Sequence, residues 1–347
     1  MYLGFYNFYR HYNGNRMFTD PKSDIGDNLS YPPVYLGQRL CALGHQVATL
    51  DMDDLSKFDV AVFLDHPTCF NPYFRRLKKM RGKKLYLFLN ENEAMRPDNY
   101  WRCNHRAFDR VFTWNTQLTD NRKYLHFYLP NYIPPIDKLD TGDQRKFCVT
   151  IASQKYSSHP QELYSERVRA IRWFEQHHPA EFDLFGTLWE HPYFTGKLAR
   201  LNLGLHKFYA CFPKVLRKQR FPSHRGTVPR KHDVLKQYKF AICYENAIFP
   251  GYITEKIFDA LFAGCIPVYL GAPDVAEQIP AGVFIDKRQF KNYDALYDYL
   301  HNMPESEYLD YRQAIEQFLT GPGIHPFSAE HFADTVIQHI VGEGATP

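Results

Sequence analysis

The sequence has no pair of cysteines at the spacing of a metal-binding or redox motif. Its seven cysteines are scattered along 347 residues, and none belongs to a C-x-x-C pair. This pattern argues against a zinc ribbon and against a disulfide-stabilised scaffold, and it favours a reducing compartment. Cys148, Cys243 and Cys265 lie within apolar, strand-like runs, which predicts buried free thiols.

Long hydrophobic runs are also missing. No apolar stretch approaches the roughly 20 residues that a membrane span needs, and the N-terminus lacks the pattern of a signal peptide. The net charge of +4 is too mild to indicate nucleic acid, so no nucleic-acid partner is expected. These absences predict a cytoplasmic protein, either free or peripheral at the inner face of the membrane.

The length favours more than one core. At 347 residues the chain exceeds the usual size of a single hydrophobic core, which predicts two domains. Short apolar strands alternate with helical segments over about the first 130 residues, the pattern of a Rossmann-like α/β domain. Strands are expected at residues 2–8, 45–50, 58–64, 84–89, 110–114 and 126–129, with helices at 34–43 and from Pro72 to Gly82.

The second half of the chain continues this alternation after a segment rich in proline and charge, residues 133–145, which places a linker at 135–146. We therefore expect an N-terminal domain over 1–134, a second domain over 147–325, and a C-terminal helix within 326–347. Strands are expected at 147–152, 182–185, 240–244, 265–270 and 283–285, with helices at 164–174, 305–319 and 328–341.

The most informative stretch is residues 239–271, KFAICYENAIFPGYITEKIFDALFAGCIPVYLG. It reads as a strand, a loop with Pro250 and Gly251, a helix, and a second buried strand. Thr254 is placed to cap the helix, with its hydroxyl accepting a backbone N–H of the first turn, and Gly264 marks the helix end. Two apolar strands joined by a short helix predict a right-handed parallel crossover.

Polar side chains gather where the first of these strands ends and the helix begins. Ligands bind at this edge of a parallel sheet, and the free N–H groups of a first helical turn favour an anion. The edge therefore suits the diphosphate and ribose of a nucleotide-sugar, although for an isolated helix a solvated first turn is the simpler interpretation. The polar residues expected at this edge are Glu245, Asn246, Tyr252, Glu255 and Lys256.

The string YENAIFPGYITEKIFDALFAGCIPVYLG closely resembles the donor-binding motif of the α-1,3-fucosyltransferases, glycosyltransferase family 10. Members of that family carry an E-N-S-like triplet after a strand, a D-Y-I-T-E-K-like helix start and a P-V-like strand. The similarity continues through residues 272–286. Ala247 replaces the usual Ser, and Gly251 stands where animal members carry Asp, which makes the bacterial branch the closer relative.

The resemblance implies an α/β fold of the GT-B architecture, in which two Rossmann-like domains face a central cleft. Residues 1–134 would bind the acceptor, and residues 147–325 the nucleotide-sugar donor. The implied enzyme is inverting and independent of metals, and it needs no cofactor besides its donor substrate, GDP-fucose. It transfers fucose to a hydroxyl of N-acetylglucosamine or glucose, with an α-1,3 or α-1,4 linkage. The acceptor is an oligosaccharide or lipid-linked glycan in surface polysaccharide or lipopolysaccharide O-antigen synthesis.

Two other interpretations stay open. The same fold could use another GDP-sugar, because no residue here is known to recognise guanine or the 6-deoxy carbon of fucose. A non-catalytic protein that binds nucleotide, glycan or polyanion is the alternative from a different class.

The resemblance also implies roles for individual residues. A second cation for the diphosphate is expected from Arg167, with Arg169 as the alternative, because helical periodicity does not choose between them. Glu91 matches the general base in a T-G-E-N-like string after a first-domain strand, and Glu93 is the fallback because in an extended stretch it points to the same side. The donor-binding set is completed by Glu245, Asn246, Tyr252, Ile253, Glu255 and Lys256. Asn246 and Tyr252 would contact phosphate or sugar, and Glu255 the hydroxyls of ribose or sugar.

Two further patterns stand outside the motif. Residues 51–53, D-M-D, match the D-x-D of metal-dependent glycosyltransferases, but they end a strand in an exposed turn, so no metal role is expected. Residues 191–232 contain ten lysines or arginines, several aromatics and no acidic residue. This segment is expected to contact an anionic membrane surface or lipid-linked acceptor, or to line the donor pocket. A nucleic-acid patch is a third option, and a solvated insertion is an equally simple interpretation.

Overall fold

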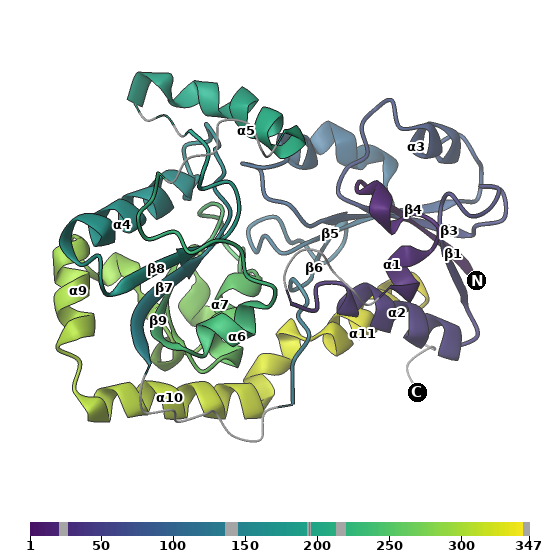
Figure 1. The fold of residues 1–347 in the computed structure, drawn as a ribbon. Helices are drawn as coiled ribbons and strands as arrows, with labels where there is room; N and C mark the ends of the chain where they lie inside the picture. Colours follow the sequence, from purple (N-terminus) through teal and green to yellow (C-terminus); the bar gives the residue numbers. More distant parts are fainter. Residues whose placement is uncertain (21–26, 136–144, 193, 195, 213–219, 343–347) are drawn as a thin grey trace. The chain divides into compact units, whose positions relative to one another are not determined.

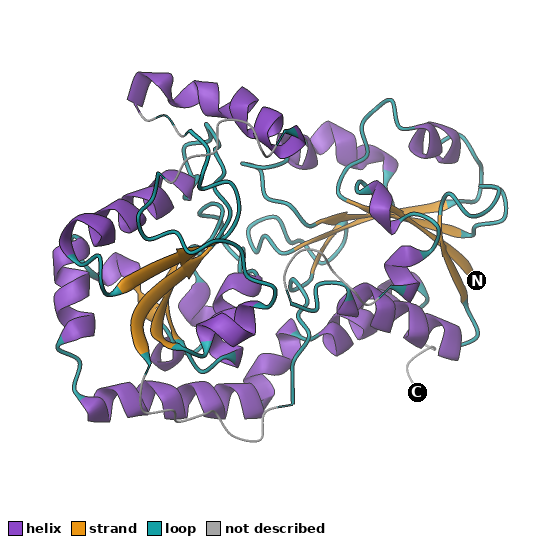
Figure 2. Cartoon of the chain, in the orientation of Figure 1, coloured by secondary structure: helices purple, strands orange, loops and turns teal. Residues whose placement is uncertain are grey.

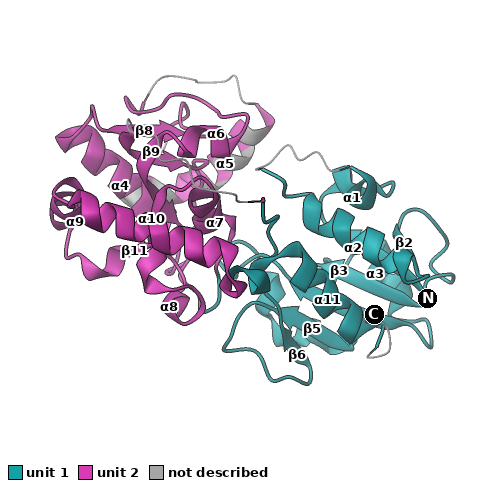
Figure 3. Cartoon of the chain, turned by 90° about the horizontal axis from the view of Figure 1, so that it is seen from below, with its two compact units in different colours: residues 1–134, 250–252, 324–347 teal, residues 135–249, 253–323 magenta. Residues whose placement is uncertain are grey.

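The computed structural model describes the chain except for residues 21–26, 136–144, 193, 195, 213–219 and 343–347 (Figure 1). The linker expected at 135–146 therefore lies almost entirely outside the described residues. The chain divides into two compact units (Figure 3). Unit 1 comprises residues 1–134, 250–252 and 324–347, and unit 2 comprises residues 135–249 and 253–323.

Unit 1 is built on a parallel sheet, whose described strands run in the order β2-β1-β3-β4-β5-β6. The apolar runs of β3 and β4 are buried along almost their whole length, as expected for central strands of a sheet covered on both faces. The strands span Tyr2–Asn7 (β1), Gln46–Thr49 (β2), Val60–Leu64 (β3), Lys84–Leu89 (β4), Arg110–Thr113 (β5) and Tyr124–His126 (β6).

Helices flank this sheet (Figure 2). The C-terminal helix α11 belongs to unit 1, where Phe332 packs against Phe88 and Phe127 of the sheet region. The α-helices of unit 1 are Arg16–Thr19 (α1), Tyr31–Ala42 (α2), Pro72–Leu77 (α3) and Ala329–Ile340 (α11), with short 3-10 helices at Arg10–Tyr12, Pro97–Tyr100 and Arg102–Ala107.

Unit 2 contains a second parallel sheet, with its described strands in the order β11-β10-β9-β7-β8. The chain adds β8 on one side of β7, and then β9, β10 and β11 on the other side. The strand order therefore reverses between β7 and β9, and ligands of open α/β sheets bind beside the carboxyl ends of strands at such a point. The strands span Lys146–Ile151 (β7), Phe182–Phe185 (β8), Tyr238–Tyr244 (β9), Ile266–Leu270 (β10) and Ile285–Asp286 (β11).

Helices cover the faces of this second sheet as well (Figure 1). The longest is α10, which with α9 closes the unit after β11. The α-helices are Tyr164–His177 (α4), Asn202–Cys211 (α5), Lys231–Leu235 (α6), Glu255–Phe262 (α7), Val275–Gln278 (α8), Tyr293–His301 (α9) and Glu305–Thr320 (α10). Short 3-10 helices lie at Gly196–Leu201 (η4), Ala281–Val283, Lys287–Gln289 and Pro322–Phe327.

The two sheets confirm the expected α/β class with two Rossmann-like domains. The crossover within residues 239–271 is confirmed as well, because β9, α7 and β10 follow one another and β9 pairs with β10 in parallel. The three cysteines expected to be buried, Cys148, Cys243 and Cys265, are buried free thiols.

Some boundaries differ from those expected. Asn71 caps α3 as predicted, its side chain accepting the N–H of Phe74 at 2.9 Å, but the helix ends at Leu77 and not at Gly82. The last strand of unit 1 was expected at 126–129 and instead ends at His126. Phe127, which follows the strand, is buried and packs its ring against Phe332 of α11.

Candidate functional site

Glu245 forms buried hydrogen bonds with the start of helix α7. It is fully buried at the end of β9, where its carboxylate accepts the N–H of Thr254 at 2.8 Å and the Thr254 hydroxyl at 2.7 Å. The Nζ of Lys256 lies 3.4 Å from the same carboxylate. Burial raises the pKa of Glu245, an effect that the nearby Lys256 opposes. Glu245 therefore supports the helix start, whereas the sequence placed it on the ligand-facing edge.

The predicted helix cap is wrong in its chemistry. Thr254 is the first residue before α7, but its hydroxyl does not accept an N–H of the first turn. It donates to Glu245 and accepts a hydrogen bond from the Nζ of Lys256 at 2.9 Å. The hydrogen bond that the hydroxyl donates to a carboxylate is stronger than one that it accepts from a backbone N–H. The Thr254 side chain therefore turns inward, toward Glu245. The Thr254 hydroxyl therefore accepts no hydrogen bond from the first-turn N–H groups of α7.

Glu255 and Lys256 form a charged pair at the first turn of α7, with Nζ to Oε1 at 3.2 Å. Burial alone would raise the pKa of Glu255, but Lys256 and Lys231 lower it to about 2. Burial alone would lower the pKa of Lys256, but Glu255 and Glu245 raise it above its ordinary value. Both side chains are therefore charged at neutral pH, and both remain partly exposed.

Arg167 on α4 is a buried cation, only 4% exposed. Its Nη2 donates to the backbone carbonyls of Tyr244 at 2.8 Å and Glu245 at 3.3 Å, at the carboxyl end of β9. Within the described part of the chain, no carboxylate forms a salt bridge with it. Arg169, the alternative candidate, is exposed and pairs with Glu166 on its own helix. The geometry thus separates two arginines that helical periodicity left equivalent.

One hollow brings three cations together in unit 2. It is small, with a volume of about 30 Å³, and its lining includes Arg167, Lys231 and Lys256, from α4, α6 and α7. Sequence reasoning missed Lys231, which bonds Asp259 of α7 at 2.7 Å. Nothing in the sequence singles it out among the ten basic residues of the segment 191–232. The cluster suits an anion with more than one charged oxygen, because three cations from three elements converge on it.

Tyr252 and its neighbour Gly251 fall in unit 1 and not with this hollow. The Tyr252 ring packs 4.7 Å from that of Trp114. Gly251 has a φ of +78°, and a Cβ there would lie 2.1 Å from the carbonyl oxygen of Trp114. Any other residue would therefore be strained at this position. Ile253 is buried, and Asn246 accepts the N–H of Leu163 through its backbone at 3.0 Å.

Glu91 lies in unit 1, just after β4. Its backbone is held by Asp65, which follows the neighbouring strand β3 and has a φ of +65°. The Asp65 carboxylate accepts the N–H groups of Asn90 at 2.8 Å and Glu91 at 3.0 Å, and the side chain of Asn99 at 2.6 Å. Asn99 and Tyr100 in turn donate to the Glu91 carbonyl. Sequence reasoning missed the role of Asp65, and the signal that could have indicated it is a single Asp directly after the neighbouring strand β3.

The expectation that Glu93 points to the same side as Glu91 is wrong in its premise. It assumed an extended stretch, but the chain turns directly after Asn92, whose carbonyl accepts the N–H groups of Met95 and Arg96. Asn92 is fully buried between the two partly exposed glutamates. The rule of alternating sides does not apply across such a turn, so it cannot pair Glu93 with Glu91.

The D-x-D pattern is engaged in local bonds. Asp51 accepts the N–H of Gly14 at 2.8 Å, and Asp53 pairs with Lys57 at 2.7 Å. Outside the omitted segments, no three His, Cys, Asp or Glu side chains are arranged to hold a metal ion. The described helices also include none with the length and hydrophobicity that crossing a membrane requires.

Residues 217–320 match the model of the glycosyltransferase family 10 (fucosyltransferase) C-terminal domain. Among curated proteins, the α-(1,3)-fucosyltransferase FucT of Helicobacter pylori is 42% identical over 85 residues, which are 24% of this chain and 18% of that protein. The GDP-fucose protein O-fucosyltransferase 3 of Xenopus laevis is 38% identical over 91 residues, 26% of this chain and 19% of that protein. The aligned stretches thus span less than a fifth of these relatives.

Structural similarity to solved glycosyltransferases extends over nearly the whole chain. A crystal structure of an α1,3-fucosyltransferase superposes with a TM-score of 0.56 and 17% identity, covering 99% of this chain and 91% of that one. An α-glucosyltransferase in complex with UDP-glucose and DNA superposes with a TM-score of 0.52 and 10% identity, covering 90% and 95%. These neighbours confirm the GT-B class.

Proposed function

Because residues 217–320 match the model of the glycosyltransferase family 10 (fucosyltransferase) C-terminal domain, we propose that the chain is an inverting, metal-independent fucosyltransferase that uses GDP-fucose. The observation that carries this proposal is Arg167, a buried guanidinium that forms no salt bridge with a carboxylate among the described residues. A buried charge is costly unless it is paired. A diphosphate in the hollow with Lys256 supplies the missing anion.

The donor diphosphate is the leaving group of the reaction. As the bond between the fucose anomeric carbon and the phosphate oxygen breaks, negative charge builds on the phosphate. Arg167, Lys231 and Lys256 offset this charge, which lets the reaction proceed without a metal ion. Glu255 binds the hydroxyls of ribose or sugar beside them, in its charged form because its pKa is about 2. Asn246 and Tyr252 complete the donor contacts.

Glu91 is the general base. It takes the proton of the acceptor hydroxyl as that oxygen attacks the anomeric carbon from the side opposite to the diphosphate, which inverts the configuration. The bonds from Asp65, Asn99 and Tyr100 fix the Glu91 backbone, as a positioned base requires. Among the described residues no comparable set of bonds holds Glu93, which supports Glu91 over it.

The acceptor is a hydroxyl of N-acetylglucosamine or glucose in an oligosaccharide or lipid-linked glycan, joined through an α-1,3 or α-1,4 linkage. The similarity to the α-(1,3)-fucosyltransferase of Helicobacter pylori supports the α-1,3 linkage. The product would serve surface polysaccharide or lipopolysaccharide O-antigen synthesis in the cytoplasm. The alternative acceptor is a protein hydroxyl, which the name of the Xenopus relative favours.

Peripheral contact with an anionic membrane belongs to the same proposal. Four large apolar side chains are exposed on η4 and α5, within the basic segment 191–232: Leu198, Leu201, Phe208 and Phe212. Exposed apolar side chains within a sequence segment rich in lysine and arginine suit the headgroup region of an anionic bilayer. Co-sedimentation with phosphatidylglycerol vesicles at low salt should fall in Phe208→Ser but not in Phe70→Ser, which alters an equally large exposed ring in unit 1.

The decisive test is donor turnover. Purified protein is incubated with GDP- and UDP-sugars in the presence of EDTA, with and without lactose, N-acetyllactosamine, N-acetylglucosamine or a peptide acceptor, and released nucleotide is measured. We expect acceptor-dependent GDP release from GDP-fucose alone, lost in Glu91→Gln and Lys256→Met. Consumption of another GDP-sugar would refute the fucose assignment. Failure to bind GDP at all would refute the enzyme assignment in favour of a non-catalytic protein.

A further inference from the structure

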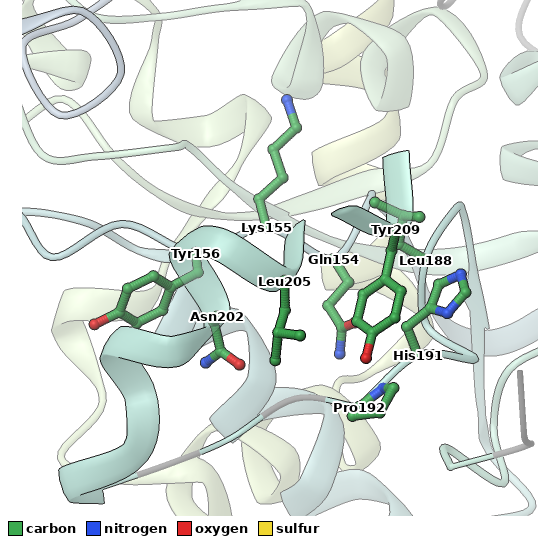
Figure 4. Close-up of a pocket in the computed structure, with 9 residues that line it drawn as sticks. All are labelled: Gln154, Lys155, Tyr156, Leu188, His191, Pro192, Asn202, Leu205 and Tyr209. Atoms are coloured by element: carbon green, nitrogen blue, oxygen red, sulfur yellow. The ribbon is translucent and has the colours of Figure 1, made fainter. Parts of the chain in front are cut away.

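A large hollow in unit 2 lies at the edge of the sheet opposite to the cationic one. Its volume is about 270 Å³, against about 30 Å³ for the cationic hollow and about 20 Å³ for a third, between the loops after β7 and β8 and helix α5. Figure 4 shows the side chains of Leu205 and Tyr209 reaching into that third hollow, which leaves little free space in it. The large hollow has the volume of about nine water molecules at ~30 Å³ each, so it admits a small organic ligand.

This hollow, called here the amino-edge hollow, is separate from the proposed donor site. Its lining includes Phe147 and Phe240, near the starts of β7 and β9. The cationic hollow is lined by Ile151 and Tyr244, at the ends of the same two strands. Parallel strands all start at one edge of their sheet and end at the other, and the four residues from Phe240 to Tyr244 span roughly 13 Å at about 3.3 Å each. The amino-edge hollow is therefore not part of the site that holds the diphosphate.

Part of the lining of the amino-edge hollow is apolar and aromatic. Phe240 and Leu300 are buried, and Phe147 is half-buried, with its ring 5.5 Å from that of Phe240. The exposed ring of His301, the last residue of α9, lies 6.1 Å from the Phe147 ring at an angle of 65°. A partly exposed aromatic ring in a concave site offers a flat apolar face to a ligand.

Charged side chains of both signs complete the lining. They are two cations and two carboxylates, Arg145, Lys239, Glu181 and Glu305. With histidine counted as neutral, these charges cancel. Arg145 is held by backbone carbonyls, and Glu181 accepts the Tyr297 hydroxyl at 2.6 Å. Lys239 and Glu305 form no salt bridge within the described part of the chain, which leaves a donor and an acceptor for a ligand.

On these grounds we propose that the amino-edge hollow binds one ring of a neutral sugar, apart from the site of transfer. A sugar ring has an apolar C–H face and a rim of hydroxyls, and each hydroxyl both donates and accepts hydrogen bonds. The ammonium of Lys239 donates to these hydroxyls, the carboxylate of Glu305 accepts from them, and the apolar face lies on the ring of Phe147. A ligand with a net charge is not favoured, because the lining has none.

Backbone amide NMR of the full chain, titrated with N-acetyllactosamine, locates the site directly. The amides of Phe147 and Lys239 should shift and saturate with a Kd on the order of 1 mM, as a single ring with few polar contacts supports. Sulfate and L-phenylalanine are the comparison probes, the first with a net charge and the second with two opposite charges and an aromatic ring. Larger shifts of these amides with either probe than with the sugar would overturn the assignment to sugar. Sugar-dependent shifts confined to unit 1 would overturn the site.

Three substitutions test the individual contacts. Lys239→Met and Glu305→Gln keep the approximate length of the side chain and remove its charge, and Phe147→Leu keeps an apolar group but removes the flat ring. Each should weaken sugar binding at the amino-edge hollow about tenfold. The matched controls are Lys236→Met and Glu316→Gln, in α6 and α10 regions that do not line this hollow, and both should leave the Kd unchanged. An unchanged Kd in all three test variants, with melting temperatures equal to that of the parent, would overturn the site.

GDP release in the presence of N-acetyllactosamine separates this site from the proposed transfer site. Lys239→Met and Glu305→Gln should keep GDP release within about twofold of the parent, because both lie at the other edge of the sheet from Lys256. A loss of GDP release that matches the loss of sugar binding would overturn a separate site. Sugar-dependent shifts at the amino-edge hollow of a protein that transfers no fucose would uphold the site and remove the proposed activity.

Discussion

Replacing Arg167 by methionine tests the central electrostatic argument, because it should lower turnover strongly and change stability little. The change keeps an unbranched side chain of similar length in the core but removes the charge. For turnover, removing one preorganised donor to a developing charge costs about 10²–10³-fold in kcat. Arg167→Met should therefore lose at least about 100-fold in GDP release, while its KM for the donor also rises.

The stability of Arg167→Met follows from the bonds that it loses. The variant gives up two hydrogen bonds to the carbonyls of Tyr244 and Glu245, worth about 1 kcal/mol each. It also removes a buried charge that no described carboxylate pairs, and replacing buried charged groups by apolar ones is often neutral or stabilising. The two effects oppose each other, so urea unfolding should show a change within about 1 kcal/mol.

Arg169→Met is the control for this experiment. Its guanidinium is exposed and forms a salt bridge with Glu166 on the same helix, so turnover should change by less than about threefold and stability by less than about 0.5 kcal/mol. An equal loss of turnover in the two variants would refute the assignment of Arg167. A decrease of more than about 3 kcal/mol in the free energy of unfolding of Arg167→Met would also refute this assignment, because it would show that the guanidinium mainly supports the fold.

Three further predictions concern stability in urea. Gly251→Ala should cost several times the roughly 1 kcal/mol expected for Gly14→Ala, because both have positive φ but only at Gly251 does the new Cβ meet a backbone carbonyl, at 2.1 Å. Thr254→Val should lose about 1–3 kcal/mol with its two buried hydrogen bonds, which Thr254→Ser should retain. Burial lowers the pKa of His66 to about 4, so on acidification the unfolded chain binds this proton before the folded chain does. The free energy of unfolding should therefore fall by about 3 kcal/mol between pH 6.5 and pH 4. In His66→Asn this fall should be smaller. A flat profile for the parent protein over that range would contradict the His66 prediction.

The architecture around the site was predictable because its signals are local. The strands β9 and β10 are continuous apolar runs with turn residues at their ends, and the helix between them has a 3.6-residue period closed by Gly264. Those features fix a parallel crossover, and a parallel crossover fixes which edge of the sheet holds the ligand. The position of Lys256 at that edge followed from the same reasoning.

The partners of individual side chains were not predictable, because they come from distant parts of the chain. The choice between Arg167 and Arg169 depends on the carbonyl of Tyr244, which is 77 residues away in the sequence. Whether Glu245 faces a ligand or supports a helix depends on how far Thr254 and Lys256 turn inward. Periodicity assigns a residue to a face of its own element, but it does not say what that face meets.

The placement of Glu245 changes how the anion site is understood. Taken alone, a buried carboxylate at the helix start repels a diphosphate. Its two acceptor oxygens, however, hold the backbone of Thr254 and position the ammonium of Lys256, so the buried negative charge fixes a cation in place before the donor arrives. Preorganised charges stabilise a transition state more than mobile ones, because no reorganisation is needed as the charge develops. Glu245→Gln should accordingly lower kcat more than it weakens GDP binding, and a variant that lost binding and turnover in equal measure would show that Glu245 serves the bound state alone.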